Sequence, residues 1–113
     1  HQVYKEKLLA ASETDTIVTG KTLGHPVRAL KTPFTKKFAS MEKDPQVTPE
    51  QILEYGSGSL RKAVQNGDET YGSFMAGQSV GLIKEIKPAA EIIQEMVSDA
   101  ESLLKMGTML VDN

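Results

Sequence analysis

The spacing of apolar side chains predicts a chain made mostly of short helices. Between residues 3 and 11, apolar side chains recur at helical spacing with charges between them, which indicates a short amphipathic helix. A longer stripe after Pro88 predicts a final helix that ends at Gly107, with residues 108–113 as a tail. This stripe covers about two and a half heptads, which is too short to favour a coiled coil. It consists of Ala89, Ile92, Ile93, Met96, Val97, Ala100, Leu103 and Leu104.

Two threonine–proline pairs mark further helix starts. A threonine side chain caps a helix N-terminus, and proline fits the first helical position. Thr32–Pro33 therefore predicts a helix that runs to about Lys43. Thr48–Pro49, with Gln51 completing a capping box, predicts a helix that ends near Gly56.

One segment has the composition of a strand. Asp15–Gly20 places β-branched residues in a row before a glycine, and it is the only good strand pattern in the chain, so we expect its partner strand to lie outside this sequence. A loop follows, in which a proline holds the preceding His25 in extended geometry. Two further helices are predicted, over Ser59–Asn66 with Gly67 as its stop and over Ser73–Lys84.

The helix predicted over residues 73–84 carries a stripe of small side chains. Ser73, Gly77 and Gly81 recur every four residues and would share one helix face. Such a stripe allows close approach of a neighbouring backbone, which the spacing favours, or of a flat ligand. The ligand alternative is supported by the free N–H groups that a helix N-terminus would present at Gly72–Ser73.

A histidine loop and a basic segment are the other candidate features. The imidazole of His25, between a glycine and a proline, could donate a proton or bind phosphate, although a loop histidine bonded to the backbone is the favoured interpretation. No nucleophile–base arrangement is visible. Four basic residues without an intervening acid form a solvated face, which is favoured, or a docking patch for an acidic or phosphate-bearing partner. They are Arg28, Lys31, Lys36 and Lys37.

Composition narrows the class of protein. The 113 residues, 39% of them apolar, suit one domain with a modest core. Because the chain has only 3 Tyr and 3 Phe, we expect aliphatic side chains and methionine to fill that core. No apolar run approaches the roughly 18 residues of a membrane span. The first methionine is Met41, and short helices with one strand make a poor self-sufficient fold, so we expect a longer polypeptide.

Charge and cysteine content exclude several kinds of site. The absence of cysteine excludes a disulfide scaffold and a thiolate site, and it suits a reducing cytosol. The two histidines and the scattered carboxylates show no metal-ligand spacing. A formal net charge of -2 disfavours nucleic acid as the main partner.

Five blocks, taken in their order and spacing, resemble one enzyme family. They are Asp15–Gly20, Gly24–Arg28, Gly67–Asp68, Gly72–Gln78 and Gly81–Ile83. Over most of the chain they resemble the C-terminal third of the FMN-dependent enoyl-acyl-carrier-protein reductases (class II) of bacterial fatty-acid synthesis, in the nitronate monooxygenase (2-nitropropane dioxygenase) superfamily. The resemblance implies an α+β fold, predominantly helical with one or a few short strands, that is the C-terminal part of a flavin-binding TIM-barrel enzyme.

The resemblance also implies an organisation and a set of partners. Residues 1–71 would form a smaller substrate-side α+β domain, and residues 72–107 would return as helices to a TIM barrel outside this sequence. FMN would be the cofactor, NADH or NADPH the reductant, and an enoyl group on acyl carrier protein the substrate. A cytoplasmic location and a homodimer are compatible with this family, and no membrane or nucleic-acid partner is expected.

Site residues follow from the same resemblance. The flavin-binding residues would be Ser73, Met75, Ala76, Gly77 and Gln78. The substrate contacts would be His25, Arg28 and Met75, and the carrier-docking residues Lys31, Lys36 and Lys37. The catalytic histidine and the phosphate-binding glycines belong to earlier barrel strands, so we expect no catalytic residue here and no activity from these 113 residues alone. Two alternatives stay open: a nitronate monooxygenase, and a non-enzymatic helical interaction module.

Overall fold

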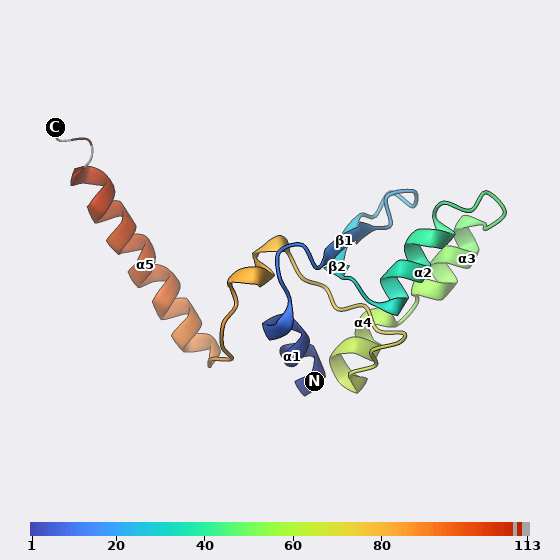
Figure 1. Cartoon of the computed structure of the whole chain (residues 1–113), viewed down its shortest axis with the longest axis horizontal. Coiled ribbons are helices and arrows are strands. Elements are labelled where there is room, and N and C mark those ends of the chain that lie inside the picture. Colours follow the sequence, from blue (N-terminus) through green and yellow to red (C-terminus); the bar gives the residue numbers. More distant parts are fainter. Residues whose placement is uncertain (110, 112–113) are drawn as a thin grey trace.

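The structure has two unequal parts, a body that ends near residue 82 and a helix that projects from it (Figure 1). The computed structural model describes residues 1–109 and 111. The molecule measures 62 × 33 × 19 Å along its principal axes, because the final helix adds length without covering the body.

Helices predominate around one two-stranded sheet, which confirms the predicted α+β class. The short segments are α4, a single helical turn, η1, a π-helical turn, and η2, a 3-10 turn. In chain order the elements are α1 (Gln2–Ala10), β1 (Thr16–Thr19), β2 (Val27–Leu30), α2 (Pro33–Met41), α3 (Pro49–Gly56), α4 (Ser59–Arg61), η1 (Lys62–Asn66), η2 (Gln78–Leu82) and α5 (Ala89–Met109).

The predicted helix caps in the body are confirmed. Thr32 Oγ1 accepts a hydrogen bond from the Thr35 N–H, at 3.3 Å, at the start of α2. At the start of α3, Thr48 Oγ1 accepts from the Gln51 N–H at 3.3 Å, while Gln51 Oε1 accepts from the Thr48 N–H at 2.8 Å. Gly67 ends η1 at φ 62°, a left-handed conformation that suits glycine.

The partner of the predicted strand lies within the chain, so the expectation of an outside partner is wrong. Strands β1 and β2 form an antiparallel hairpin in which Thr16 lies opposite Leu30. Pro26 and the charge of Arg28 give β2 the sequence character of a loop, and four residues are too few to show a clear alternation. Strand β2 forms because it pairs with β1 through backbone hydrogen bonds, and the composition of β2 alone does not predict this pairing.

The helix predicted over residues 73–84 is wrong for its first half, which is extended and pairs with the free edge of β2. The Leu30 N–H donates to the Phe74 carbonyl at 2.8 Å, and the Ala76 N–H donates to the Arg28 carbonyl at 3.3 Å. Only η2, a short 3-10 turn, is helical here. The expected helix N-terminus with free N–H groups is therefore not formed.

As a result, Ser73, Gly77 and Gly81 do not share a helix face. Pairing with β2 and the complete burial of Phe74 outweigh a helix that two glycines weaken by about 1 kcal/mol each. Close packing does explain one member of the stripe, because a Cβ at Gly81 would lie 2.9 Å from the backbone nitrogen of Glu13.

Two apolar clusters form the core of the body. The first joins Leu30, Ala63, Phe74 and Val80, with side chains of α1 packed against it. The second joins Phe34, Phe38 and Ile52 between α2 and α3. Aliphatic residues do contribute to the core as expected, but the expectation left out the three phenylalanines, all of which are buried: each ring buries a large apolar area, so few aromatic residues suffice.

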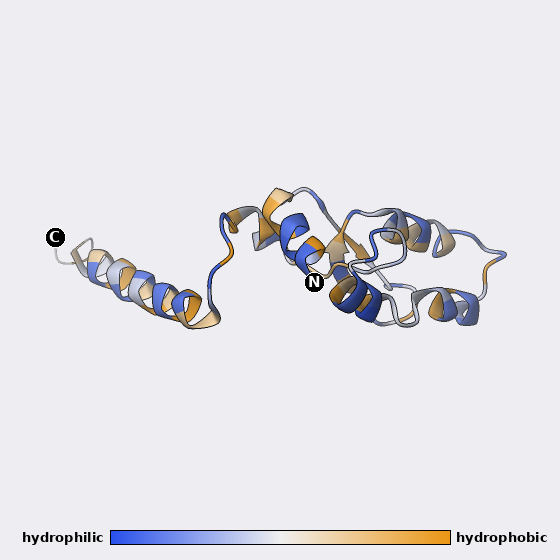
Figure 2. Cartoon of the chain, turned by 90° about the horizontal axis from the view of Figure 1, so that it is seen from below, coloured by the Kyte–Doolittle hydropathy of each residue, from blue (hydrophilic) through white to orange (hydrophobic). Residues whose placement is uncertain are grey.

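Helix α5 has an apolar stripe but no buried residue. In Figure 2 hydrophilic and hydrophobic residues alternate along it, as an amphipathic helix requires. The predicted stop at Gly107 is wrong, because the helix continues through this glycine to Met109, and the predicted tail therefore begins later; residues 110 and 112–113 lie outside the described part. None of the described helices has both the length and the hydropathy that a membrane span requires.

Lys87 ties the segment before α5 to the first turns of that helix. Its Nζ lies 2.7 Å from Glu85 Oε1 and 2.6 Å from Glu95 Oε1. Hydrogen bonds to Glu85 and Glu95 raise the pKa of Lys87 above its usual range, so this half-buried ammonium stays charged.

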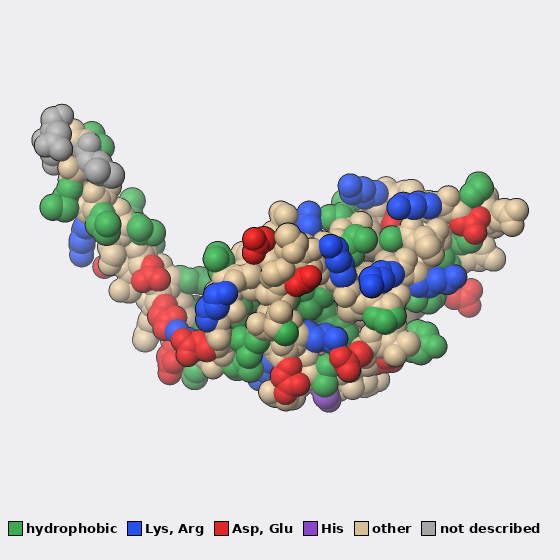
Figure 3. Space-filling view, viewed as in Figure 1, with side chains coloured by type: hydrophobic (Ala, Val, Ile, Leu, Met, Phe, Trp, Pro, Cys, Tyr) green, Lys and Arg blue, Asp and Glu red, His purple; other side chains and the backbone are tan. Residues whose placement is uncertain are grey.

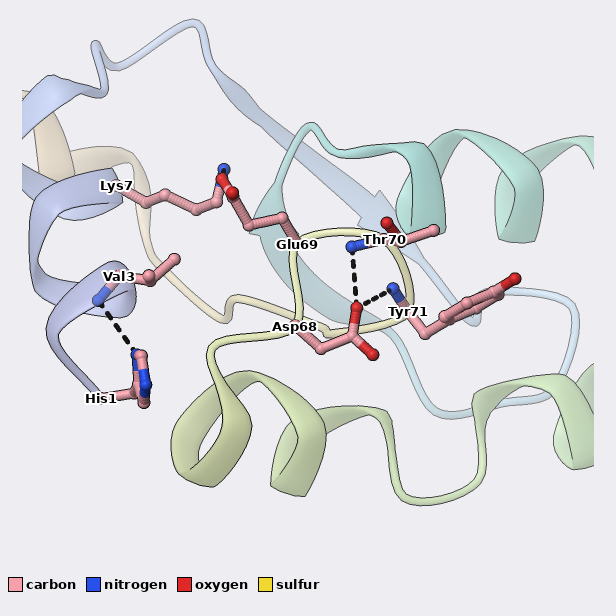
Figure 4. A network of polar contacts seen from close by, with 7 residues as sticks. All are labelled: His1, Val3, Lys7, Asp68, Glu69, Thr70 and Tyr71. Atoms are coloured by element: carbon pink, nitrogen blue, oxygen red, sulfur yellow. Dashed lines mark hydrogen bonds and ion pairs between the residues drawn. The ribbon is translucent and has the colours of Figure 1, made fainter.

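A polar network on the body joins α1 to the turn that follows η1 (Figure 4). Lys7 forms a 2.7 Å ion pair with Glu69. Asp68 Oδ1 accepts from the backbone N–H groups of Thr70 and Tyr71, both at 2.9 Å, which makes an Asx turn. The Gly67–Asp68 block thus has a structural role: it reverses the chain toward the extended segment.

Candidate functional site

A cleft of about 370 Å³ lies between the β1–β2 hairpin loop, α2, α3 and the extended segment. Its lining is mostly apolar, with polar groups at the base and rim, which is the usual composition of a site for an organic ligand. The lining residues are Thr19, Gly20, Leu23, His25, Val27, Phe34, Phe38, Leu53, Gly56, Ser57, Ser59, Ser73 and Met75.

Met75 enters this cleft because the segment around it is extended. Successive side chains of an extended chain point to opposite sides, so Phe74 turns into the core while Met75 turns toward the cleft. The Met75 side chain is 39% exposed, which leaves its thioether available to a ligand.

The backbone of Met75 is held by a residue near the N-terminus. Tyr4 Oη on α1 donates a 2.7 Å hydrogen bond to the Met75 carbonyl oxygen, and the Tyr4 ring packs on Phe74 with centroids 5.0 Å apart. Burial raises the pKa of Tyr4 by more than this hydrogen bond lowers it, so the phenol remains a donor at neutral pH. Met75 therefore has a fixed main chain and a partly exposed side chain.

Serine and glycine residues shape the floor of the cleft. Ser73 is buried, and its N–H donates to the Ser59 carbonyl at 3.0 Å, which joins the extended segment to α4. A Cβ at Gly56 would lie 3.0 Å from Phe38 Cε2, so a glycine at this position lets α3 approach the phenylalanine wall.

His25 lies at the rim on the hairpin loop. Gly20 and Gly24 adopt left-handed conformations with φ 80° and 77°, which give the loop its tight path. The His25 backbone N–H donates to the Gly20 carbonyl at 3.0 Å. The main chain of His25 closes the loop, while its exposed side chain lines the cleft.

The structure thus brings together three of the residues predicted for the site: Ser73, Met75 and His25. The remaining predicted residues lie outside the cleft lining. Arg28 Nη1 donates to Thr16 Oγ1 at 2.9 Å, and Ala76 packs against the first core cluster. Gly77 precedes η2, and Gln78 begins it.

The basic residues occupy the surface beside the cleft. Lys36 and Lys37 are exposed on α2, which turns its phenylalanines the other way, into the second core cluster. Lys31 is exposed, and its Nζ donates to the Thr14 carbonyl at 2.7 Å. In Figure 3 Lys and Arg side chains are spread over the body together with several Asp and Glu, and a further group of Asp and Glu lies where α5 begins.

The sequence interpretation missed the apolar wall of the cleft. Phe34 and Phe38 recur four residues apart on a helix that was predicted, so their common face was a usable signal. Ser57, in the connection after α3, and Ser59, the first residue of the short α4, gave no such signal.

Comparison with known proteins places these features in a family. The sequence model of the nitronate monooxygenase family matches residues 1–99. FabK from Thermotoga maritima is 50% identical, with a TM-score of 0.84 over 96% of this chain and 34% of that one. A methionine-to-alanine mutant of FabK from the same organism matches at 43% identity, with a TM-score of 0.71 over 96% of this chain and 31% of that one.

A curated protein of Staphylococcus saprophyticus, named as a probable nitronate monooxygenase, is 29% identical over 104 residues, which are 91% of this chain and 28% of that protein. The chain therefore spans about a third of the length of the proteins that it matches. These matches agree with the resemblance of the five sequence blocks. The chain belongs to the nitronate monooxygenase family.

Proposed function

We propose that this chain is the C-terminal part of a cytoplasmic, FMN-dependent enoyl-acyl-carrier-protein reductase that uses NADH or NADPH. The observation that carries the proposal is the 50% identity to FabK at a TM-score of 0.84, against 29% identity to the nitronate monooxygenase relative. FabK is an enzyme of the reductase class that the five blocks resemble. A nitronate monooxygenase is the second candidate, because the family model carries that name.

Within this proposal the cleft receives the acyl end of the substrate. Its wall of Phe34, Phe38 and Leu53 suits a hydrocarbon, and His25 at the rim suits a polar part of the thioester or its carrier arm. The separation into residues 1–71 and 72–107 remains part of the proposal, although residues 73–77 are extended rather than helical.

One side chain of this part of the protein suits contact with FMN. The partly exposed thioether of Met75 is a suitable apolar contact for a flavin ring, with Ser73, Ala76, Gly77 and Gln78 holding the segment. The described residues that line the cleft include no lysine or arginine, so the flavin phosphate would be held by other parts of the full-length protein. When bound, FMN supplies hydride chemistry, and the residues of this chain orient the acyl group and exclude water.

The basic surface suits an acidic carrier protein. Lys36 and Lys37 lie on the outer side of the helix that carries the phenylalanine wall, so a carrier docked there would sit close to the cleft. Lys31 adds a third positive charge. Surface charges of this kind steer association more than they add affinity.

The deciding experiment compares two reactions of the full-length protein loaded with FMN. We expect NAD(P)H-dependent reduction of crotonyl-acyl-carrier protein with a kcat/KM at least about a hundredfold above that for oxidation of a simple alkyl nitronate, which corresponds to about 2.7 kcal/mol of transition-state preference. Faster nitronate oxidation would establish the second candidate instead. Absence of both reactions, with a folded protein, would favour the interaction module.

A further inference from the structure

A single carboxylate joins two walls of the cleft. Glu42 is the residue that follows α2, the helix that supplies Phe34 and Phe38 to the lining. Its Oε2 accepts the Gly20 N–H at 3.0 Å, and its Oε1 accepts both the Thr22 N–H at 3.1 Å and the Thr22 hydroxyl at 2.8 Å. These partners lie 20 and 22 residues away in the sequence, on the hairpin loop.

Glu42 binds the hairpin loop that contains Leu23 and His25, two residues that line the cleft. Leu23 also packs against the second core cluster, so an apolar contact and a polar anchor act on the same short segment. Gly20 needs its left-handed φ of 80° to bring the loop around. Without an acceptor, the amides of Gly20 and Thr22 would have to bond to water, and the loop would lose its fixed distance from α2.

We propose that Glu42 is a positioning residue that holds the Gly20–Pro26 loop against α2 and thereby fixes the opening of the cleft. The nature of the ligand, an acyl thioester, rests on the proposed function; the anchoring role does not. Charge-assisted hydrogen bonds of this kind are about twice as strong as neutral ones, and this carboxylate makes three of them.

The ionisation of the carboxyl group supports the anchor. Burial alone would raise the pKa of Glu42, but hydrogen bonds from Gly20 and Thr22, with a smaller contribution from Lys21, lower it below the ordinary glutamate value. The group is therefore an anion, with every lone pair available as an acceptor, at neutral pH.

The test uses full-length Glu42→Gln and a matched control, Glu54→Gln, which makes the same change at an exposed position of the neighbouring α3. In Glu42→Gln, amide hydrogen exchange at Gly20 and Thr22 should accelerate at least about tenfold, because one neutral amide oxygen replaces two anionic acceptors. Exchange across α3 should stay unchanged. The control should match the wild type at all of these sites.

Two readouts then connect the loop to the cleft. Oxidation of Met75 by hydrogen peroxide, followed by mass spectrometry, should be several times faster in Glu42→Gln than in the control, since Met75 and the loop held by Glu42 line the same cleft. The KM for crotonyl-pantetheine should rise about tenfold while kcat stays within about twofold, because uniform binding is lost and the chemistry is not. Glu42→Asp, which keeps the charge on a shorter arm, should recover part of the exchange protection.

Unchanged exchange at Gly20 and Thr22, or faster exchange without faster Met75 oxidation, would overturn the proposal. Exchange that accelerates throughout the body would also overturn it, because Glu42 would then serve general stability only. A wild-type protein that reduces no enoyl thioester would defeat the proposed function, and the exchange and oxidation measurements would still decide the role of Glu42.

Discussion

The body buries a set of its apolar side chains, whereas helix α5 leaves its apolar side chains exposed. In the body, Phe74 is completely buried and Ala63 lies beside it in the first core cluster. On α5, Leu104 is 72% exposed and no residue is buried. The body therefore buries a core within itself, whereas the apolar stripe of α5 is not covered by any of the described residues.

The overall dimensions express the same difference. The radius of gyration is 18.3 Å, compared with roughly 13 Å for a compact domain of this length. A helix of 21 residues rises about 30 Å at the usual 1.5 Å per residue, which accounts for much of the added length. We therefore expect an apolar side chain of the body to contribute more to the free energy of unfolding than an apolar side chain of α5.

The largest effect should come from the core of the body. Phe74→Ala removes a fully buried ring and should lower the free energy of unfolding of the full-length protein by about 3–5 kcal/mol. Denaturant titration followed by circular dichroism measures this loss. A loss below 1 kcal/mol, a value well under the usual range for buried phenylalanine, would contradict the assignment of Phe74 to a closely packed core.

The matching change on α5 should depend on context. In the 113-residue chain, Leu104→Ala should change the free energy of unfolding by less than about 0.5 kcal/mol, as for other exposed sites. In the full-length protein it should cost about 2–4 kcal/mol if the stripe packs on a barrel, as we propose. Denaturant titration of both forms makes the comparison, and equal small losses would leave α5 without a partner.

At the cleft, charge should be poorly tolerated. Met75→Asp places a carboxylate on an apolar wall and should lower kcat/KM for an enoyl thioester at least about a hundredfold, or about 2.7 kcal/mol. Lys36→Ala, a surface change on α2, should lower it less than about threefold. Steady-state kinetics of the two variants test the assignment, and equal effects would remove Met75 from the site.

A smaller effect is expected on the basic surface. Replacing Lys36 and Lys37 together by Glu should raise the KM for carrier-linked enoyl substrate about five- to tenfold and spare the coenzyme A analogue, because under the proposed function only the carrier protein would contact this surface. Paired steady-state assays with the two substrates give the ratio. If the ratio does not change, the carrier docks elsewhere.

The smallest expected effect is on how the stability of the folded protein changes in acid. The pKa of Glu42 in the folded protein lies below the ordinary glutamate value of about 4.3, so the associated stability is present above the unfolded pKa and declines as the pH falls through the folded pKa. Thermal unfolding measured from neutral pH downward should show this decline. Glu42→Gln should have a shallower slope in acid than the wild type, and identical slopes would remove Glu42 from the acid response.

Much of the fold follows from local sequence rules. Thr32 and Thr48 start α2 and α3 as predicted, because capping depends on neighbouring residues alone. Strand β2 and the extended segment were missed, because both owe their conformation to pairing with distant residues. Helix propensity and small-residue spacing do not report the free edge of a hairpin.

The candidate site divides in the same way. The resemblance named Met75, Ser73 and His25, which the structure places in one cleft. The phenylalanine wall is accessible from the sequence, because Phe34 and Phe38 recur four residues apart on one face of a helix with a clear N-terminal cap. The anchor from Glu42 could not be inferred, because the hydrogen bonds cross 20 and 22 residues of sequence and require the folded loop.

The hydrogen bond between Tyr4 and Met75 also defines how the molecule can be dissected. The cleft is lined by residues 19 to 75, yet the main chain of Met75 depends on a phenol from α1. A fragment that begins at β1 would keep every lining residue but would lose the hydrogen bond that supports Met75. The shortest segment that keeps both the cleft lining and the Tyr4 support of Met75 therefore begins at α1 rather than at β1.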